Sequence, residues 1–405
     1  MRLYAFEGIH YTLGAGDAGD AGALVAPPYD QINDALRDRF HAQSPHHFAH
    51  LSKPVAPEGG DPYRFAAALH HKWLREGVIA RDPRPAIYPY VIELAGGGER
   101  LGVLGLVRYE DPAVIRPHEQ TLDKPLADRT ALLEAMHVDL EPVLLLSEDP
   151  GRLDALLRED LRDRQPQVRH RDSDGHYHVL YRVDDPERIG RYREVLDVPS
   201  AIADGHHRYK VGQRFATAHH AAPDTAAAAK LAVVTSLDSP ALTIDPIHRA
   251  FKEPIDPAKL AGLAASVESF AGPNGKRSGH AFAAAVAAAE QPALGLWVLG
   301  REPEVWRFDS PSLAVEIFQE TILPALGLRP EASTDGTVVY RSDAGELWSQ
   351  VAAGDLGTGI WLPPMQPAAF AAAIAGGKML PAKSTRFLPK VMSGLTWADH
   401  DSKVL

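Results

Sequence analysis

The chain has 405 residues, of which 45% are hydrophobic and 23% charged, and its formal net charge at pH 7 is -11. This composition fits a globular protein of two or three domains, and the lack of cysteine excludes disulfides, thiolate metal sites and cysteine nucleophiles. No basic block or tail occurs, which argues against a nucleic-acid partner. The sequence shows neither a signal peptide nor an apolar run of membrane-spanning length, so we expect a cytoplasmic protein without a membrane partner.

Hairpins and helices alternate in the first part of the chain. Helical periodicity occurs around residues 32–40 and over 63–77, where a glycine ends the pattern. The runs 87–94 and 100–109 flank a glycine-rich turn and indicate a hairpin, and 168–183 indicates a second one. The remaining predictions here are a helix beginning near Leu126, a buried strand at 143–146, a helix at 152–162, a strand–turn–helix around Gly205 and a strand at 231–237.

The composition changes after Arg249, and we place a domain boundary near residue 252, which gives domains 1–252 and 253–405. The second domain begins with an alanine-rich stretch that predicts helix over 257–289. Hairpins mixed with helices predict an α+β fold with mixed sheets and a second α+β domain at the C-terminus. The other elements predicted there are a hairpin at 294–308, helices at 312–328, 344–353 and 368–376, and strands at 337–340 and 359–362.

The segment around Gly205 predicts an anion-binding helix start. An apolar strand would end at Asp204, turn at Gly205 and continue as a helix from His206. With Asp204 as N-cap, the first turn would present backbone N–H groups beside the side chains of His207 and Arg208. Such a helix start favours phosphate. The alternative is a solvated helix start that binds no ligand.

A glutamate occurs in the segment from Arg116 to Thr121, which follows a strand and a turn and is therefore expected on a connecting loop. Glu119 could act as general base on a bound hydroxyl, and the adjacent His118 could orient it. The alternative is that Glu119 forms an ion pair with a neighbouring helix.

Two further segments carry polar groups that suit a nucleotide. Asp128 and Arg129, near the start of a predicted helix, could bind a nucleotide or could pair with one another. Lys383, Ser384, Thr385 and Lys390, on a loop with two prolines, offer donors for phosphate oxygens. The alternative for this loop is a solvated tail.

The 19 histidines raise the question of a metal site. His46 and His50 are spaced to lie on one helix face, but no glutamate follows the first histidine as in a zincin motif. Spacing alone is weak evidence for a transition metal. A metal-dependent hydrolase is therefore the lowest-ranked of three functional hypotheses.

Seven of the chain's motifs occur, in the same order, in one known family. They are Pro27-Pro28-Tyr29-Asp30, residues 73–82, Arg116–Thr121, Ala127-Asp128-Arg129, residues 203–209, His248-Arg249 and residues 383–395. On these motifs the chain is identified as a member of the family called domain of unknown function 1015, over nearly its whole length. The family label implies no activity.

Two of the motifs also resemble the signature segments of the free serine kinases, enzymes of the ParB/sulfiredoxin-like superfamily. These kinases phosphorylate the hydroxyl of free L-serine from a nucleotide donor. The resemblance rests on Pro117–Gln120 and Asp204–Arg208. It implies that Glu119 is the base, that the turn after Asp204 holds the nucleotide phosphates, and that the core is ParB/sulfiredoxin-like. The two segments lie far apart here, whereas a short connection joins them in the kinases.

The resemblance and the charge pattern together give an expected site in one cleft. We expect catalytic roles for Glu119, Asp204 and His206, and Asp204 is also the expected Mg²⁺ ligand. The expected nucleotide- and phosphate-binding residues are Gly205, His206, His207, Arg208, Asp128, Arg129, Lys383, Ser384 and Thr385. His118, Tyr29 and Asp30 are expected to bind the substrate.

The expected function is phosphoryl transfer from ATP or ADP to a small hydroxyl compound, with free L-serine as the first candidate. The second hypothesis is a nucleotide-binding switch or interaction module without turnover.

Overall fold

The structure is a computed structural model that describes residues 1–12, 21–119 and 123–404, without the side chains of residues 21, 22 and 123–125. The chain divides into two compact units. Unit 1 contains Met1–Pro117, Leu122–Leu242 and Pro389–Leu405, and unit 2 contains His118–Thr121 and Thr243–Leu388. The sequence placed the boundary near residue 252, whereas the two units part between residues 242 and 243.

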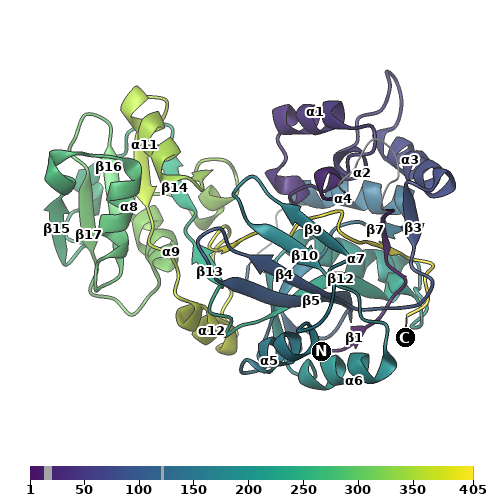
Figure 1. The fold of residues 1–405 in the computed structure, drawn as a ribbon. Coiled ribbons are helices and arrows are strands. Elements are labelled where there is room, and N and C mark those ends of the chain that lie inside the picture. The colour runs from purple at the N-terminus through teal and green to yellow at the C-terminus, as the bar shows by residue number, and fades with distance from the viewer. Residues whose placement is uncertain (13–20, 120–122, 405) are drawn as a thin grey trace. The chain divides into compact units, whose positions relative to one another are not determined.

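Unit 1 is built on a mixed sheet of nine strands, in the order β6-β11-β8-β12-β5-β4-β10-β9 with β1 beside β5 (Figure 1). Two neighbouring pairs, β6–β11 and β8–β12, are parallel, and the other pairs are antiparallel. This mixed sheet confirms the predicted α+β class. The strands are β1 (Leu3–Tyr4), β4 (Tyr88–Glu93), β5 (Glu99–Arg108), β6 (Ile115–Arg116), β8 (Val143–Ser147), β9 (Val168–Arg171), β10 (Tyr177–Leu180), β11 (Ser200–Asp204) and β12 (Ala229–Ser236).

Both predicted hairpins of unit 1 are present, because each has a turn sequence between two apolar runs. The first is β4–β5 and the second is β9–β10. Short strand pairs lie outside the main sheet, namely β2 (Ile9–Tyr11) with β3 (Ile79–Arg81) and β7 (Val138–Asp139) with β21 (Ala398–Asp399).

Helices cover both faces of the unit 1 sheet (Figure 1). On one face α5 and α6 bury Leu153, Leu157 and Tyr192 against Val103 and Leu145 of the sheet, which explains why β5 and β8 are apolar almost throughout. On the other face α7 packs on β8 and β12, and α4 packs on α7. The helices are α1 (Asp34–Gln43), α2 (Ala49–Ser52), α3 (Pro62–Glu76), α4 (Asp123–Met136), α5 (Arg152–Asp160), α6 (Pro186–Val195) and α7 (His206–Ala218), with the short 3-10 helices η1 (Ala21–Leu24), η2 (Tyr29–Gln31) and η3 (Ala226–Ala228).

Local capping explains where several of these helices begin and end. The Asp61 carboxylate accepts from the backbone N–H groups of Tyr63 and Arg64 at the start of α3, and Gly77 ends this helix with φ of 72°. The predicted start of α4 near Leu126 is wrong, because the helix already begins at Asp123.

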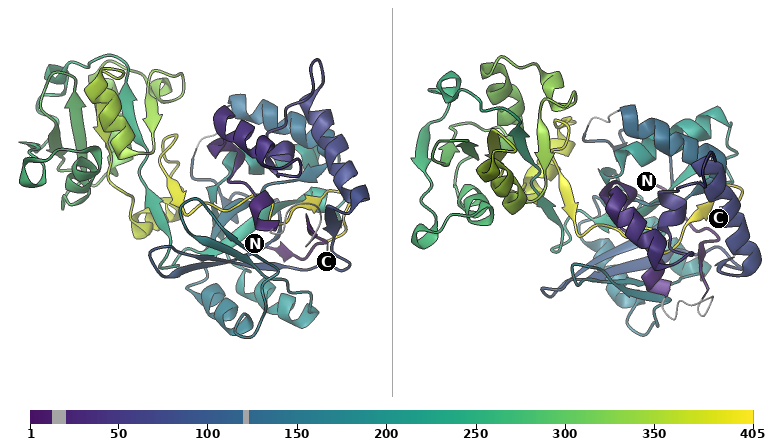
Figure 2. Two further views of the ribbon diagram at one scale, coloured as in Figure 1. Left: turned by 45° about the horizontal axis from the view of Figure 1, so that its top comes forward. Right: turned by 90° about the horizontal axis from the view of Figure 1, so that it is seen from above.

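Unit 2 contains a six-stranded antiparallel sheet in the order β15-β17-β16-β19-β14-β18 (Figure 2). Helices α8 and α11 cover one face, where Phe282 and Leu347 pack near Trp361. The strands are β13 (Thr243–Asp245), β14 (His248–Phe251), β15 (Ser266–Ser269), β16 (Ala293–Val298), β17 (Glu304–Arg307), β18 (Val339–Arg341), β19 (Thr358–Trp361) and β20 (Arg386–Leu388), and β13 pairs with β20. The helices are α8 (Gly279–Ala287), α9 (Ala314–Ile317), α10 (Leu323–Ala325), α11 (Ala344–Ala353) and α12 (Pro367–Ala375), with the 3-10 helices η4 (Pro257–Leu260), η5 (Pro273–Gly275) and η7 (Pro330–Ser333).

Two predicted helices of unit 2 are shorter than expected. Within 257–289 only η4, η5 and α8 are helical, because Gly262 and Gly272 adopt φ of 79° and 78° and the chain between them forms β15. The helix expected at 312–328 contains a π-helical turn, η6 (Phe318–Ile322), directly before Pro324. Proline lacks the N–H that regular α-helix pairing needs, which accounts for the irregularity.

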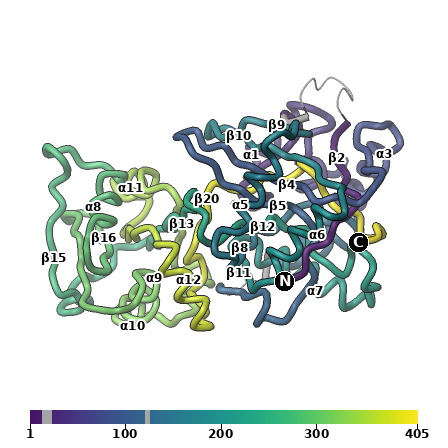
Figure 3. The backbone as a smooth tube through the Cα atoms, turned by 60° about the horizontal axis from the view of Figure 1, so that its bottom comes forward, coloured from purple at the N-terminus to yellow at the C-terminus, as the bar shows by residue number. Residues whose placement is uncertain are grey.

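The last segment of the chain returns to unit 1, where it runs beside strands from the N-terminal part (Figure 3). Ser393 forms a bridge with Ala26, and Trp397 forms one with Ile9. The Met392 N–H donates to the Tyr90 hydroxyl at 3.3 Å. Over the described residues, no helix has the length and apolarity to cross a membrane.

Candidate functional site

The turn between β11 and α7 has the predicted strand–turn–helix form, but its cap differs from the prediction. Gly205, with φ of 91°, is the N-cap, and it makes no side-chain cap hydrogen bond among the described residues. The expected N-cap role of Asp204 is therefore wrong. A Cβ at Gly205 would meet Val143 Cγ1 at 2.9 Å and Arg208 Nη2 at 3.0 Å, so both backbone angle and space favour glycine. His206 and His207 are half-buried in the first turn.

The Asp204 carboxylate is held by two cations instead of by the helix. One oxygen accepts from Lys390 Nζ at 2.7 Å and the other from Arg208 Nη2 at 2.7 Å. Burial opposes ionisation of Asp204, but Lys390 and Arg208 outweigh it and hold its pKa well below the usual range. Asp204 is thus a carboxylate at every physiological pH.

Arg208 is buried and directed into unit 1, with its side chain only 7% exposed. Besides Asp204 it donates to the Pro142 carbonyl, and Nη1 lies 4.0 Å from Glu141 Oε2. Burial works against its charge, but Asp204 and Glu141 together raise the pKa of Arg208. Its donors in the described structure therefore go to protein acceptors, and its first role is to fix Asp204.

Glu141 connects several of the predicted residues, although it was not among the residues selected from the sequence. Its Oε1 accepts from the Tyr29 N–H at 3.2 Å, and Oε2 is buried without a hydrogen-bond partner among the described residues. Burial raises the pKa of Glu141, and Arg208 and Arg129 partly oppose this. A single acid between Leu140 and a proline, next to an apolar strand, is the signal that could have identified it.

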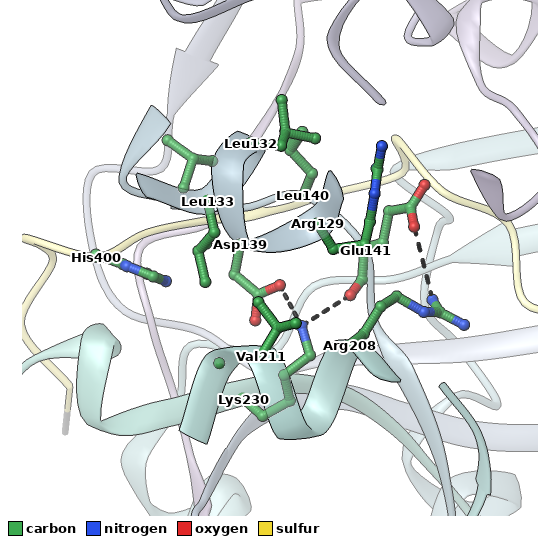
Figure 4. A pocket seen from close by; sticks show the side chains of 12 residues that line it. Arg129, Leu132, Leu133, Asp139, Leu140, Glu141, Arg208, Val211, Lys230 and His400 are labelled. Atoms are coloured by element: carbon green, nitrogen blue, oxygen red, sulfur yellow. Dashed lines mark hydrogen bonds and ion pairs between the residues drawn. The ribbon is translucent and has the colours of Figure 1, made fainter. Parts of the chain in front are cut away.

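A cavity of about 50 Å³ lies beside Glu141 (Figure 4). Its polar lining comprises Arg129, Asp139, Glu141, Arg208, Lys230 and His400. The Lys230 ammonium donates to Asp139 and to the Glu141 carbonyl. The volume suits a few water molecules and is too small for a nucleotide.

Asp128 and Arg129 pair with one another, which was one of the two alternatives for them. Arg129 Nη2 lies 2.6 Å from Asp128 Oδ2, and Tyr63 donates to the other oxygen at 2.9 Å. Arg129 also donates to the Ser52 carbonyl at 2.8 Å, and its guanidinium lies 4.2 Å from the centre of the Tyr29 ring. Burial raises the pKa of Tyr29 to about 12. Asp30, the next residue, is exposed.

In unit 2, Glu119 is held by the loop that precedes β20. Its Oε1 accepts from the Lys383 N–H, and Lys383 has φ of 60°, an uncommon angle for a residue with a side chain. The Glu119 side chain is 15% exposed, and its Oε2 lies 3.9 Å from His118 Nε2. Gln120 and Thr121, which close the same motif, lie outside the described residues.

His118 is buried, with 1% of its surface exposed. Its Nε2 forms a hydrogen bond with Thr385 Oγ1 at 2.8 Å, and its ring meets the edge of Phe370 at 4.8 Å between centres. Ser384 is also buried and donates to the Pro381 carbonyl at 2.6 Å. His118, Ser384 and Thr385 thus hold the loop in place, and the Lys383 side chain is exposed on it.

The residues around Asp204 do not fit a Mg²⁺ site in this arrangement, because both oxygens are occupied by cations. The group of potential metal ligands found among the described residues is Asp172, Asp174 and His176. It lies on the β9–β10 turn, where Asp172 accepts from the backbone N–H groups of Asp174 and His176. Hydrogen bonding within the turn accounts for this cluster without a metal.

The structure therefore brings the predicted residues together in two sets. Unit 1 joins Tyr29, Arg129, Asp204 and Arg208 through Glu141 and Lys390, and unit 2 joins Glu119, His118, Lys383 and Thr385.

Comparisons with known proteins give one match to a family and several to solved structures. No curated protein matches the chain. A conserved hypothetical protein from Pyrococcus furiosus is 14% identical, with 75% of this chain and 94% of that chain covered and a TM-score of 0.37. A free serine kinase in complex with AMP is 15% identical, with 73% and 92% covered and a TM-score of 0.39. A mutant free serine kinase in complex with ADP is 14% identical, with 74% and 92% covered and a TM-score of 0.40.

The family model described as "Protein of unknown function (DUF1015)" matches residues 3–303. Since this match covers most of the chain, the protein belongs to the DUF1015 family.

Proposed function

We propose that the protein is a phosphotransferase that moves a phosphoryl group from ATP or ADP to the hydroxyl of a small molecule, with free L-serine as the first candidate acceptor. The observation that carries the proposal is the start of α7, where a helix N-terminus with glycine as its N-cap adjoins Asp204 and the cations Arg208 and Lys390. Backbone amides of a first helical turn and neighbouring cations are the groups that bind phosphate oxygens.

The charge balance supports a phosphate ligand. Arg208 is neutralised by Asp204 and Glu141, so Lys390 is the cation that can turn from Asp204 to a phosphate with a short movement of its side chain. Phosphoryl transfer requires mainly that the phosphate is positioned and its developing charge stabilised. His206 and His207, in the first turn, complete the set of donors that we assign to this task.

In the proposal, Glu119 is the general base for the acceptor hydroxyl. The Lys383 N–H donates to Glu119 Oε1, and Glu119 Oε2 lies 3.9 Å from His118 Nε2. These contacts hold the carboxylate in place for proton transfer. The exposed Lys383 side chain supplies a further cation for the phosphoryl group. The proposal takes serine as acceptor from the motif resemblance.

We assign no step to a metal at Asp204, since that carboxylate is occupied by two cations. Magnesium enters the proposal as the ion that accompanies the nucleotide phosphates, where it neutralises their charge. Tyr29, Asp30 and Arg129 would form the wall of the nucleotide or substrate site on the side of Glu141.

The direct test is to incubate the full chain with L-serine, Mg²⁺ and either ATP or ADP labelled on the terminal phosphate, and to look for labelled phosphoserine. Product with one donor and no product without serine is the expected result. If the protein binds nucleotide but labels neither serine nor other small hydroxyl compounds, the second candidate, a nucleotide-binding module without turnover, is correct. The burial of Arg208 favours this second candidate, because this arginine anchors the start of α7 to the rest of unit 1.

A further inference from the structure

Arg100 is a buried cation that the proposed function does not use. It lies on β5 with 2% of its surface exposed, and both Nη1 and Nη2 lack a hydrogen-bond partner among the described residues. Burial lowers the pKa of Arg100 to about 10, so the guanidinium remains charged at neutral pH. An unpaired buried charge is costly, and native proteins rarely retain one without a ligand or function.

A second unpartnered group lies on the same face of the sheet. In the β4–β5 register Arg100 is opposite Ile92 and Gly102 is opposite Tyr90, so Arg100 and Gly102 face the same side. A Cβ at Gly102 would meet the Thr235 hydroxyl at 2.9 Å. This hydroxyl is buried and also lacks a partner among the described residues. Position 102 must therefore be glycine for the Thr235 hydroxyl to lie against β5, on the face that carries Arg100.

This face adjoins the segment that carries Lys390. Tyr90, on the same face as Arg100, accepts from the Met392 N–H at 3.3 Å and bonds to His178 Nδ1 at 2.5 Å. Two residues before Met392, Lys390 binds Asp204 at 2.7 Å. Burial lowers the pKa of Arg100, and the nearby Tyr90 and Asp204 partly oppose this. The unpaired donors thus lie next to the cluster proposed to bind phosphate.

The geometry points to an oxyanion subsite formed by Arg100 and Thr235 on this face of unit 1. Its ligand is a phosphate or carboxylate group, because a guanidinium fork and a hydroxyl both donate to paired oxygens. The subsite extends the phosphate site at Asp204 and Lys390, and for the identity of the ligand it rests on the proposed function. Since the segment containing Met392 lies on this face, it must shift for the oxyanion to enter.

The subsite can be tested on the full chain by calorimetry with pyrophosphate and, separately, malonate as probes. Arg100→Met is expected to weaken binding of the preferred probe by about 10- to 100-fold, the worth of charge-assisted hydrogen bonds. Thr235→Val should weaken it less. Arg64→Met is the control, because the Arg64 side chain is 87% exposed on α3. Preference for pyrophosphate identifies a phosphate group, and preference for malonate a carboxylate.

A second readout separates binding from folding. Removing an unpaired buried charge should leave the melting temperature of ligand-free Arg100→Met equal to or above that of the wild type, while the stabilisation by the probe is lost. Arg100→Lys, which keeps the charge without the fork, should bind with intermediate affinity. Wild-type affinity for both probes in Arg100→Met overturns the subsite. If Arg100→Met does not fold, wild-type affinity for both probes in Thr235→Val and Arg100→Lys overturns the subsite instead. Absence of phosphoryl transfer, with binding still dependent on Arg100, would refute the proposed function and leave the subsite intact.

Discussion

Lys390 donates to Asp204 at 2.7 Å although 186 positions separate the two residues. Arg208, one helical turn after Asp204, occupies the other carboxylate oxygen. The C-terminal segment of the chain therefore completes the charge cluster at the start of α7. The arrangement makes the state of Asp204 depend on a residue that no local pattern connects to it.

Replacing Lys390 with methionine should make unit 1 more sensitive to acid. The folded pKa of Asp204 lies below its unfolded value of about 3.9. Asp204 therefore stabilises the fold above that pH, and this contribution is lost as the pH falls through the folded pKa. Without Lys390 the folded pKa rises, so stability at pH 7 should fall by about 1–3 kcal/mol and acid unfolding should begin at higher pH. Urea unfolding between pH 3 and pH 7 measures both, and Lys72→Met, at an exposed position of α3, is the control. An unchanged pH profile would show that Lys390 does not govern Asp204.

Replacing Glu119 with glutamine keeps the side-chain shape and removes the proton acceptor. The amide oxygen can still accept from the Lys383 N–H, so nucleotide binding should persist. Phosphoserine formation should fall by about 10²- to 10⁴-fold, the usual contribution of a positioned base. Binding is measured by calorimetry and transfer by the labelled-phosphate assay, with Glu76→Gln on α3 as the control. Joint loss of binding and transfer would mean that Glu119 holds the loop and is not the base.

Replacing Gly205 with alanine should distort the start of α7. The backbone angle of 91° disfavours any residue with a Cβ, and the added methyl would press on Val143 and Arg208. We expect a loss of about 1–3 kcal/mol in stability and weaker pyrophosphate binding, because Arg208 would move away from Asp204. Gly96→Ala is the matched control, since Gly96 has no neighbour within 4 Å of an added Cβ and no positive φ. Equal melting temperatures of the two variants would contradict the assignment.

The stability of unit 1 should fall as the pH drops below about 6.5, owing to buried histidines. His70 accepts from the Trp397 indole N–H at 3.1 Å, and burial, reinforced by His71, lowers its pKa to about 4. The unfolded chain, with a histidine pKa of about 6.5, binds the proton first, so stability is complete above pH 6.5 and decreases towards pH 4. Between these two pKa values, each such histidine lowers the free energy of unfolding by about 1.4 kcal/mol for every pH unit of acidification. His70→Gln retains an acceptor for Trp397. It should reduce the slope of the unfolding free energy against pH by the amount that corresponds to about one bound proton. An unchanged slope would mean that His70 is protonated in the fold.

Local patterns in the sequence determined many of the elements. The hairpin β4–β5 was predictable because its turn glycines stand between two apolar runs, and α3 because its end is marked by Gly77. The strand–turn–helix at Gly205 was predictable for the same reason, since its signals lie within a few adjacent residues. The same local method predicted too much helix in the alanine-rich stretch after residue 257, where the positive φ of Gly262 and Gly272 interrupts the chain.

The identity of the charged partners was decided only by the tertiary structure. Asp204 reads in sequence as an N-cap, yet it binds Lys390 and Arg208 because the last segment of the chain returns to unit 1. Glu141 and Arg100 carry no motif, and their significance comes from burial without complete pairing. Sequence patterns act through residues near in the chain, whereas ion pairs and burial depend on which distant segments pack together. The sequence by itself therefore determined where the strand–turn–helix at Gly205 forms, and the packing of distant segments decided which charges surround it.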